Sequence, residues 1–323
     1  MKAGGSAVVV ALVATYRRPQ EIRRLGECLS RQTHPVAGIV VVDNANDPTT
    51  RETVSTLPVK STYLAAASNL GCGAGLRLAE EHLLERAASV EPTPTHWWIL
   101  DDDVAPPPET LALLLEALAG AGAGMAVPLL TDHEGKIWGF PEPRQLGLRR
   151  LFRRTSDPVA VARACGSSAH PCLWTTGACQ LVSVAAVSKA GLHRTDFWML
   201  GEDLDFSMRV AQVEGAVFRG DVAVPHLPPE SPGSNSRRGY AKFCALLQNL
   251  TYLAYWNRGS AHLWRYLPGN YRRFFRTEGW GWAALRDAGD CFLSGCCGIP
   301  AGCGAGVRVR NRLAESSGGE AVK

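Results

Sequence analysis

The sequence lacks several features that would assign it to a well-defined class. Its ten cysteines include no CxxC pair, and the regular spacing of Cys165, Cys172 and Cys179 matches no structural zinc site. Because no secretory signal precedes the first strand pattern, we expect reduced, mostly buried thiols in a cytoplasmic protein. No apolar run reaches the ~20 residues that a membrane-spanning helix needs. The net charge of +4 is too small to predict nucleic-acid binding.

The sequence does contain a repeated alternation of strand and helix patterns. Residues 7–14 (AVVVALVA) and 38–42 (GIVVV) are apolar runs rich in β-branched residues, which are typical of strands buried on both faces. A helix pattern follows the first of them, and a further run at 96–100 (HWWIL) also precedes a helix pattern. Repeated strand–helix units predict an α/β fold in which helices cover both faces of a parallel sheet. Ligands of such sheets bind beyond the carboxyl ends of the strands.

Polar residues follow these strands at that predicted edge. Thr15, Asp43 and the triplet of Asp101, Asp102 and Asp103 come directly after three of the runs. Adjacent carboxylates repel each other unless a positive charge lies between them, and Mg²⁺ or Mn²⁺ bound to the diphosphate of a sugar nucleotide would supply it. Alternate residues of an extended segment point the same way, so Asp101 and Asp103 are the predicted metal ligands and Asp102 is predicted to contact the donor's sugar or ribose. The alternative is a solvated loop that caps the next helix.

A second acidic group opens a predicted helix at residues 202–214. Glu202 and Asp203 could simply be favoured there by the helix dipole. Transfer of a sugar to an alcohol, however, requires a carboxylate that accepts the hydroxyl proton, and either residue could be that base. His226 follows a predicted strand at 222–224 and is a third candidate metal ligand, because a neutral imidazole can join two carboxylates on manganese. A purely structural histidine is the alternative.

Taken in order, these segments resemble inverting glycosyltransferase family 2 over about residues 7–230. Within that family the chain is most similar to the bacterial galactofuranosyl- and rhamnosyltransferase-like branch. The resemblance implies a GT-A fold with a mixed, mostly parallel sheet flanked by helices. It also implies single displacement of a sugar from a UDP- or dTDP-sugar onto a hydroxyl of a glycan, glycolipid, lipid-linked or small-molecule acceptor. The matching segments are VVVALVATYRRP, IVVVDN, NLGCGAG, WWILDDDV, TTGACQLVS, WMLGEDLDFSMR and His226.

The resemblance implies donor-binding roles for residues of the first third of the chain. Thr15 and Asp43 would bind the base and ribose, and Arg17 or Arg18 would lie near the diphosphate. Asn69 would line the donor site. The segment TYRRP departs from the family, in which an asparagine more often precedes the arginine.

The resemblance also assigns the metal and the base. Asp101 and Asp103 would hold Mn²⁺ or Mg²⁺ together with His226. Asp203 matches the catalytic base of the family, and Glu202 would assist in positioning the acceptor.

Two tryptophans, Trp174 and Trp198, occupy positions where aromatic residues of this family stack on acceptor sugars, although a buried tryptophan is normally part of the core. Two alternative functions stay open on the sequence alone. One is a nucleotidyltransferase or sugar-nucleotide pyrophosphorylase, and the other is a non-catalytic binding protein of the same fold. The segment TYRRP lacks the glycine-rich loop that usually follows the first strand of the former class.

The domain organisation follows from a change in composition near residue 232. We predict a catalytic domain at 1–232, with a nucleotide-sugar half at about 1–130 and an acceptor half at about 131–232. An aromatic and arginine-rich helical region at 233–312 and a disordered tail at 313–323 follow. The helical region favours two interpretations: an amphipathic surface for peripheral contact with the inner face of the membrane, or a lid or homo-oligomer contact.

Overall fold

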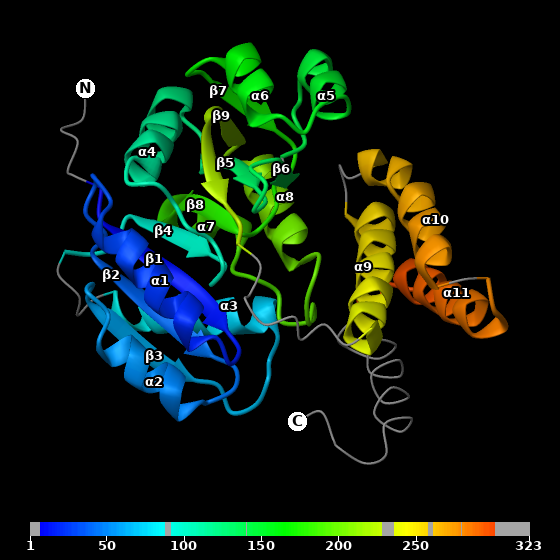
Figure 1. The fold of residues 1–323 in the computed structure, drawn as a ribbon, viewed down its shortest axis with the longest axis horizontal. Coiled ribbons are helices and arrows are strands. Elements are labelled where there is room, and N and C mark those ends of the chain that lie inside the picture. The colour runs from blue at the N-terminus through cyan, green and yellow to red at the C-terminus, as the bar shows by residue number, and fades with distance from the viewer. Residues whose placement is uncertain are drawn as a thin grey trace. The chain divides into compact units, whose positions relative to one another are not determined.

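The computed structural model describes residues 7–87, 92–139, 141–227, 236–257, 261–278 and 280–300 (Figure 1). Its strands are β1 (Val9–Thr15), β2 (Gly38–Asp43), β3 (Ser61–Ala65), β4 (His96–Leu100), β5 (Met125–Thr131), β6 (Ile137–Gly139), β7 (Ala169–Cys172), β8 (Cys179–Ser183) and β9 (Ala216–Pro225). Its helices are α1 (Pro19–Ser30), α2 (Pro48–Ser55), α3 (Cys72–Arg86), α4 (Thr110–Ala121), α5 (Leu146–Phe152), α6 (Pro158–Cys165), α7 (Val184–Ala190), α8 (Glu202–Val213), α9 (Ser236–Trp256), α10 (Leu267–Glu278) and α11 (Trp282–Cys296), with a 3₁₀ helix η1 (Ala261–Arg265).

The strands form one nine-stranded sheet in the order β3-β2-β1-β4-β8-β5-β9-β7, with β6 paired to β5. Strands β3, β2, β1 and β4 run parallel, β8 is antiparallel to both of its neighbours, and β5 and β9 are again parallel. Helices α1 and α2 lie side by side over one face of the first strands (Figure 1). This mixed, mostly parallel sheet with flanking helices confirms the predicted fold class.

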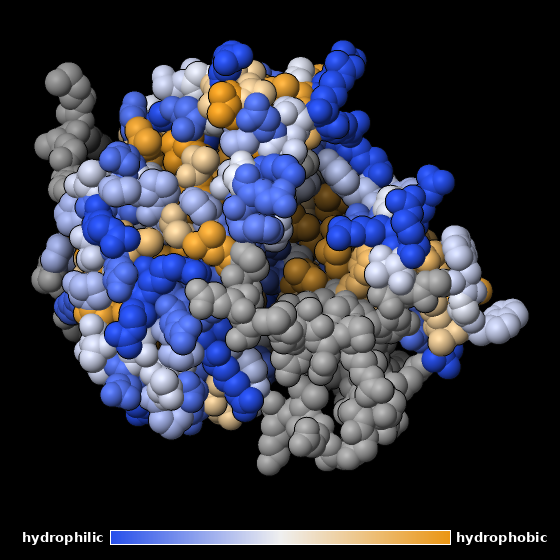
Figure 2. Space-filling view, in the orientation of Figure 1, coloured by the Kyte–Doolittle hydropathy of each residue, from blue (hydrophilic) through white to orange (hydrophobic). Residues whose placement is uncertain are grey.

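The sheet's core explains why the first strands read as unbroken apolar runs. Strands β1 and β2 are buried along almost their whole length because helices pack on the sheet at both faces. Trp97 and Trp98 of β4 point to opposite faces of the sheet, and both side chains are fully buried. Hydrophilic side chains cover much of the outer surface visible in Figure 2. The unbroken apolar runs of the sequence therefore correctly indicated strands that are buried on both faces of the sheet.

The chain folds as two compact units that are not consecutive in sequence. The first, called the sheet unit here, comprises residues 1–69, 75–193 and 206–230, and the second, the helical unit, comprises 70–74, 194–205 and 231–323. Two short segments from the first two-thirds of the chain thus join α9, α10 and α11. The predicted boundary at residue 232 and the halves near residue 130 stay predictions, and the predicted tail at 313–323 lies outside the described residues.

The helical unit has its own small core, formed around Leu247, Phe274 and Cys291. Among the described helices, none combines the length and the apolar character that crossing a membrane requires. The described cysteines of both units are free thiols, and most are buried, as the sequence predicted. Burial raises the pKa of the Cys179 thiol to about 12, which keeps this cysteine protonated and unreactive.

The arginine-rich stretch from residue 141 to about 169 has regular secondary structure. It contains α5, α6 and the start of β7. Helix α6 begins at an Asp-Pro pair, where the side chain of Asp157 accepts a hydrogen bond from the amide of Val159 and Pro158 occupies the first turn. Helix α2 begins the same way at Asp47. The Asp-Pro pair that begins a helix therefore occurs twice in the sequence, each time within a segment rich in turn-forming or basic residues.

Candidate functional site

Three side chains predicted as metal ligands meet at one end of the sheet. Asp101 and Asp103 follow β4, and His226 follows β9. Each offers one ligand atom, and these atoms lie within 4.8 Å of one another. The Nε2 atom of His226 is 3.1 Å from Oδ1 of Asp103, a buried oxygen that has no well-aligned hydrogen-bond donor among the described residues. A buried carboxylate oxygen facing an imidazole nitrogen is an arrangement that a cation would satisfy.

Backbone hydrogen bonds hold this cluster together. The amide of Leu227 donates to the carbonyl of Asp103 at 2.7 Å, and the amide of His226 donates to that of Thr131 at 2.7 Å. The imidazole of His226 also stacks on Trp138, with ring centroids 4.0 Å apart and the planes inclined by 5°. Backbone hydrogen bonds at the strand ends and a ring contact therefore fix the positions of Asp103 and His226.

Arg18 supplies positive charge to the aspartate triplet from the start of α1. Its Nη1 lies 2.7 Å from Oδ1 of Asp102 and 2.9 Å from Oδ2 of Asp103. The hydroxyl of Thr15 donates to the other oxygen of Asp102 at 2.6 Å. Asp102 is buried, and protein groups contact both oxygens of its carboxylate. The sequence did not predict these contacts with Arg18 and Thr15.

The carboxylates of the triplet differ in their electrostatics. Burial raises the pKa of Asp102 to about 6, against the opposing charge of Arg18. Burial also disfavours the charged form of Asp103, but the close approach and charge of the His226 imidazole, together with Arg18, bring the pKa of Asp103 below its usual value. Neighbouring carboxylates that share an environment are thus driven apart in acidity.

The predicted edge of the sheet is confirmed for the first strands. Thr15 and Asp43 are register partners at the ends of β1 and β2. The buried carboxylate of Asp43 accepts hydrogen bonds from the amides of Ala45 and Asp47 and from the hydroxyl of Tyr63, at 2.7–2.9 Å. These bonds build the turn after β2. The role of Asp43 and Thr15 in binding a base and ribose stays a prediction.

The remaining predicted donor residues occupy different environments. Arg17 is exposed and adopts a φ of 56°, whereas its neighbour Arg18 faces the aspartates. Asn69 is half-buried and ends the first segment of the sheet unit. Among the described residues, Arg18 is the one of these two arginines whose guanidinium contacts the triplet. Diphosphate and donor contacts of these residues stay predictions.

The backbone at the glycines after Asn69 packs closely against the backbone of residues 194–198 inside the helical unit. Gly71 has a φ of +84°, and a Cβ there would lie 1.9 Å from the carbonyl oxygen of Trp198. A Cβ on Gly73 would lie 2.9 Å from the carbonyl of Arg194. The amide of Cys72 donates to the carbonyl of Trp198 at 3.1 Å. The glycines are therefore required for close backbone approach to the segment that precedes α8.

The second acidic group begins α8 and belongs to the helical unit. Glu202 is buried, whereas Asp203 is half-buried. The Oδ1 atom of Asp203 accepts hydrogen bonds from the amides of Gly201 (3.3 Å) and Leu204 (2.8 Å), which orient the carboxylate at the helix tip. Greater exposure makes Asp203 the better placed of the two to meet an acceptor. Which of them is the base stays a prediction.

The two tryptophans predicted to bind an acceptor lie in different units. Trp174 is half-buried in the sheet unit, where its carbonyl accepts a hydrogen bond from the amide of Glu142 at 3.0 Å. Trp198 is half-buried in the helical unit. Their contact with an acceptor stays a prediction.

Comparison with known proteins gives the family. The family model described as Glycosyl transferase family 2 matches residues 10–169. The galactofuranosyltransferase GlfT1 of Mycolicibacterium smegmatis is 34% identical over 225 residues, which cover 69% of this chain and 71% of that protein. The chain belongs to glycosyl transferase family 2. This family 2 enzyme is a glycosyltransferase, and membership does not support the two alternatives, a nucleotidyltransferase or a non-catalytic binding protein.

Solved structures agree on the fold of this family 2 glycosyltransferase. The mannosyltransferase PcManGT from Pyrobaculum calidifontis, in complex with GDP-Man and Mn²⁺, matches with a TM-score of 0.55 and 18% identity over 95% of this chain and 80% of that one. A fragment of TarS from S. aureus, in complex with UDP-GlcNAc, matches with a TM-score of 0.55 and 15% identity over 94% of this chain and 83% of that one. At these identities the likeness establishes the GT-A fold alone.

Proposed function

We propose that the enzyme moves a galactofuranose- or rhamnose-like sugar from a UDP- or dTDP-sugar to a hydroxyl of a glycan or glycolipid, with inversion at the anomeric carbon. The similarity to a galactofuranosyltransferase supports the sugar class. The cluster of Asp101, Asp103 and His226 at the end of the sheet is the observation that carries the proposal. Ligands of such sheets bind beyond the carboxyl ends of the strands.

The donor set of this cluster fits a divalent cation. Two carboxylates and one imidazole are suitable ligands for Mn²⁺, and the carboxylates also suit Mg²⁺. When bound, such an ion would place positive charge beside the diphosphate that leaves during transfer. Arg18 compensates part of the negative charge of Asp102 and Asp103 and holds their carboxylates at the end of the sheet.

Asp203 is the proposed base. Its carboxylate is oriented by two backbone amides and stands at the N-terminus of α8, where the helix dipole stabilises the ionised form. That stabilisation lowers its basicity, so the acceptor proton would transfer late, as the bond to the anomeric carbon forms. Glu202, buried beside it, would help to position the acceptor.

Calorimetry with purified enzyme tests the metal cluster directly. We expect UDP or dTDP to bind in the presence of Mn²⁺ or Mg²⁺ and to bind much more weakly in EDTA. The His226→Ala variant should bind the nucleotide weakly under both conditions. Metal-independent nucleotide binding by both proteins would contradict the proposal. NMR of the product's anomeric configuration, with a panel of sugar nucleotides, tests inversion and donor identity.

We also propose that the helical unit makes peripheral contact with an anionic membrane. Trp280 and Trp282 are 69% and 89% exposed, and Arg272 and Arg276 are exposed on α10. An apolar pocket of about 450 Å³ lies in the same unit, lined in part by Phe292. Exposed tryptophan beside arginine is the composition of surfaces that settle at a lipid interface.

Flotation with vesicles tests the membrane contact. We expect the protein to float with vesicles containing phosphatidylglycerol and to remain behind with phosphatidylcholine alone. The Trp280→Ser, Trp282→Ser double variant should lose flotation and keep its mass in light scattering. A wild-type protein that does not float with anionic vesicles, or one whose surface is covered in a stable homodimer, would contradict the contact.

A further inference from the structure

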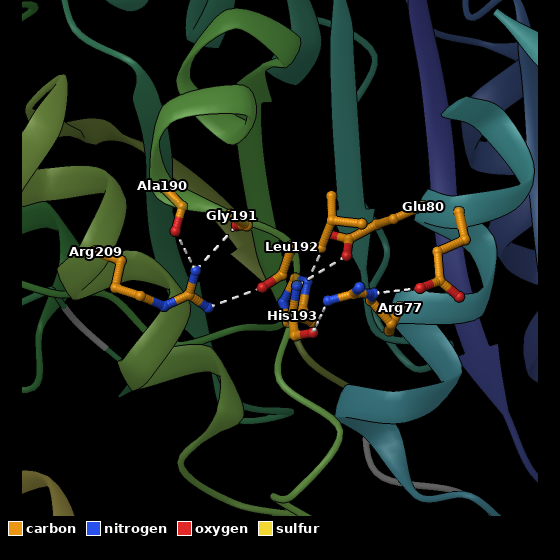
Figure 3. Close-up of polar contacts among 8 residues, drawn as sticks. Arg77, Glu80, Ala190, Gly191, Leu192, His193 and Arg209 are labelled. Carbon is orange, nitrogen blue, oxygen red and sulfur yellow. Dashed lines mark hydrogen bonds and ion pairs between the residues drawn. The ribbon is translucent and has the colours of Figure 1, made fainter. Parts of the chain in front are cut away.

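A fully buried acidic–imidazole pair lies outside the site described above. Glu80 of α3 and His193, which follows α7, are 0% and 1% exposed at their side chains. The amide of His193 donates to one oxygen of Glu80 at 2.9 Å, and Nδ1 of its ring lies 2.7 Å from the other oxygen (Figure 3). Both carboxylate oxygens are thus occupied by one residue. This contact fixes the backbone and the ring of His193 at the same time.

Two arginines complete the attachment of this segment. Helix α7 ends at Ala190, and its last carbonyls have no partner within the helix. From α8, the guanidinium of Arg209 donates to the carbonyls of residues 190, 191 and 192 at 2.6, 2.9 and 3.1 Å. From α3, Arg77 donates to the carbonyl of His193 at 3.4 Å. Four consecutive carbonyls therefore accept from side chains of two helices (Figure 3).

The same segment contacts α8 through aromatic rings. The imidazole of His193 stacks on Phe206, with centroids 4.0 Å apart and planes inclined by 21°. The guanidinium of Arg209 lies 5.5 Å from the centroid of the Phe206 ring. Phe206 is three residues after Asp203 in the same helix, so the two residues share one helical turn. The contacts at Phe206 thus fix α8 within one turn of the proposed base, Asp203.

We propose that Glu80, His193 and Arg209 are positioning residues for the transfer reaction, which act by fixing α8 and through it the carboxylate of Asp203. This inference rests on the proposed function of Asp203. Packed apolar residues could stabilise the fold as well as a buried charged pair does, whereas directional bonds also fix the register and rotation of the helix. A shift of about 1 Å in a reacting group can lower a rate by about 100-fold, so fixing the helix has a direct effect on turnover.

The test compares two variants of this group with a matched control. Glu80→Gln replaces the carboxylate that both His193 contacts use by an amide, and Arg209→Lys keeps a positive charge but cannot bridge three carbonyls. Arg219→Gln disrupts another ion pair of the sheet unit, in which the buried guanidinium of Arg219, 3% exposed at its side chain, lies 2.7 Å from Asp221 of the same strand, β9. We expect kcat to fall at least tenfold in both variants at unchanged nucleotide affinity, while the control keeps its kcat.

A double-mutant cycle separates positioning from general damage. If the group acts through Asp203, adding Glu80→Gln to Asp203→Asn should lower the residual rate by less than twofold, because the group that it positions is already gone. A low rate for Asp203→Asn together with a wild-type kcat for Glu80→Gln and Arg209→Lys overturns this inference alone. A wild-type rate for Asp203→Asn overturns the assignment of the base in the proposed function, and this inference with it. Equal loss of kcat in the Arg219→Gln control would show a structural effect only and would also overturn it.

Discussion

The two acidic segments of this enzyme, residues 101–103 and 202–205, have similar composition but are held in different ways. In the first, a guanidinium from a distant element, Arg18, compensates two carboxylates, and a histidine faces one of them. In the second, Asp203 accepts from backbone amides of its own turn. Carboxylates held by a distant cation depend on long-range folding, whereas one held by a helix tip depends on local structure. The comparison predicts different consequences for substitutions in each.

Asp103→Asn should have the largest effect. It removes a proposed metal ligand and the contacts of that carboxylate with both Arg18 and His226. We expect turnover to fall by roughly 10³-fold or more, since both the ion and the charge beside the leaving diphosphate are affected. Calorimetry with UDP and Mn²⁺ should show no metal-dependent binding. Glu52→Gln, on an exposed position of α2, is the control, and normal nucleotide affinity in Asp103→Asn would contradict the ligand assignment.

Asp203→Asn should lower kcat by about 10²- to 10⁴-fold, the usual contribution of a general base. Nucleotide affinity should stay within twofold of wild type, because Asp203 is not one of the proposed metal ligands. Steady-state kinetics and calorimetry on the same preparation separate the two quantities. An equal loss of nucleotide affinity would remove the distinction between the two acidic segments.

Arg18→Gln should mainly change stability. The variant leaves Asp102 and Asp103 without their guanidinium, and an uncompensated buried charge costs about 1–3 kcal/mol or more in the free energy of unfolding. Mn²⁺ should restore more stability to this variant than it adds to wild type, because the ion would replace the missing charge. Urea denaturation with and without Mn²⁺ measures both effects. An equal increase in both proteins would argue against a shared role of arginine and ion.

Trp138→Leu should have the smallest effect of the four. It removes the ring that stacks on His226 but leaves every proposed ligand in place. We expect the Kd for Mn²⁺ to rise roughly 2- to 10-fold, the magnitude of an aromatic pair's contribution. Titration of Mn²⁺ followed by electron paramagnetic resonance measures it. The unchanged kcat at saturating metal is the internal control.

Much of the candidate site could be predicted from the sequence, because the carboxyl ends of parallel strands lie at the same edge of a sheet. The apolar runs located β1, β2 and β4, and the rule for parallel sheets then brought Thr15 and Asp43 together. Their own hydrogen bonds could not be predicted, since these depend on turn geometry after each strand. The counterion Arg18 was missed as a partner of Asp102, although its place directly after β1 put it at the same edge.

Contacts made by irregular segments were the least predictable. Trp138 lies in β6, a short strand that pairs across an irregular register, so no periodicity marks it. The pair of Glu80 and His193 joins residues far apart in the chain, and neither belongs to a recognisable motif. A buried polar pair leaves no pattern in a single sequence because the two partners can lie any number of residues apart. Local sequence patterns therefore predicted the strands, whereas the side chains that support the site are brought together by tertiary contacts that no local pattern predicts.

The bond between the amide of Leu227 and the carbonyl of Asp103 has a consequence for the order of assembly. It joins the exits of β9 and β4, which are separated in the sheet by β8 and β5. We expect the two exits to meet only after the intervening strands have paired, because contacts between residues far apart in sequence form slowly. An ion at this position would therefore be recruited by a finished sheet, and a nascent or partly unfolded chain would not capture it.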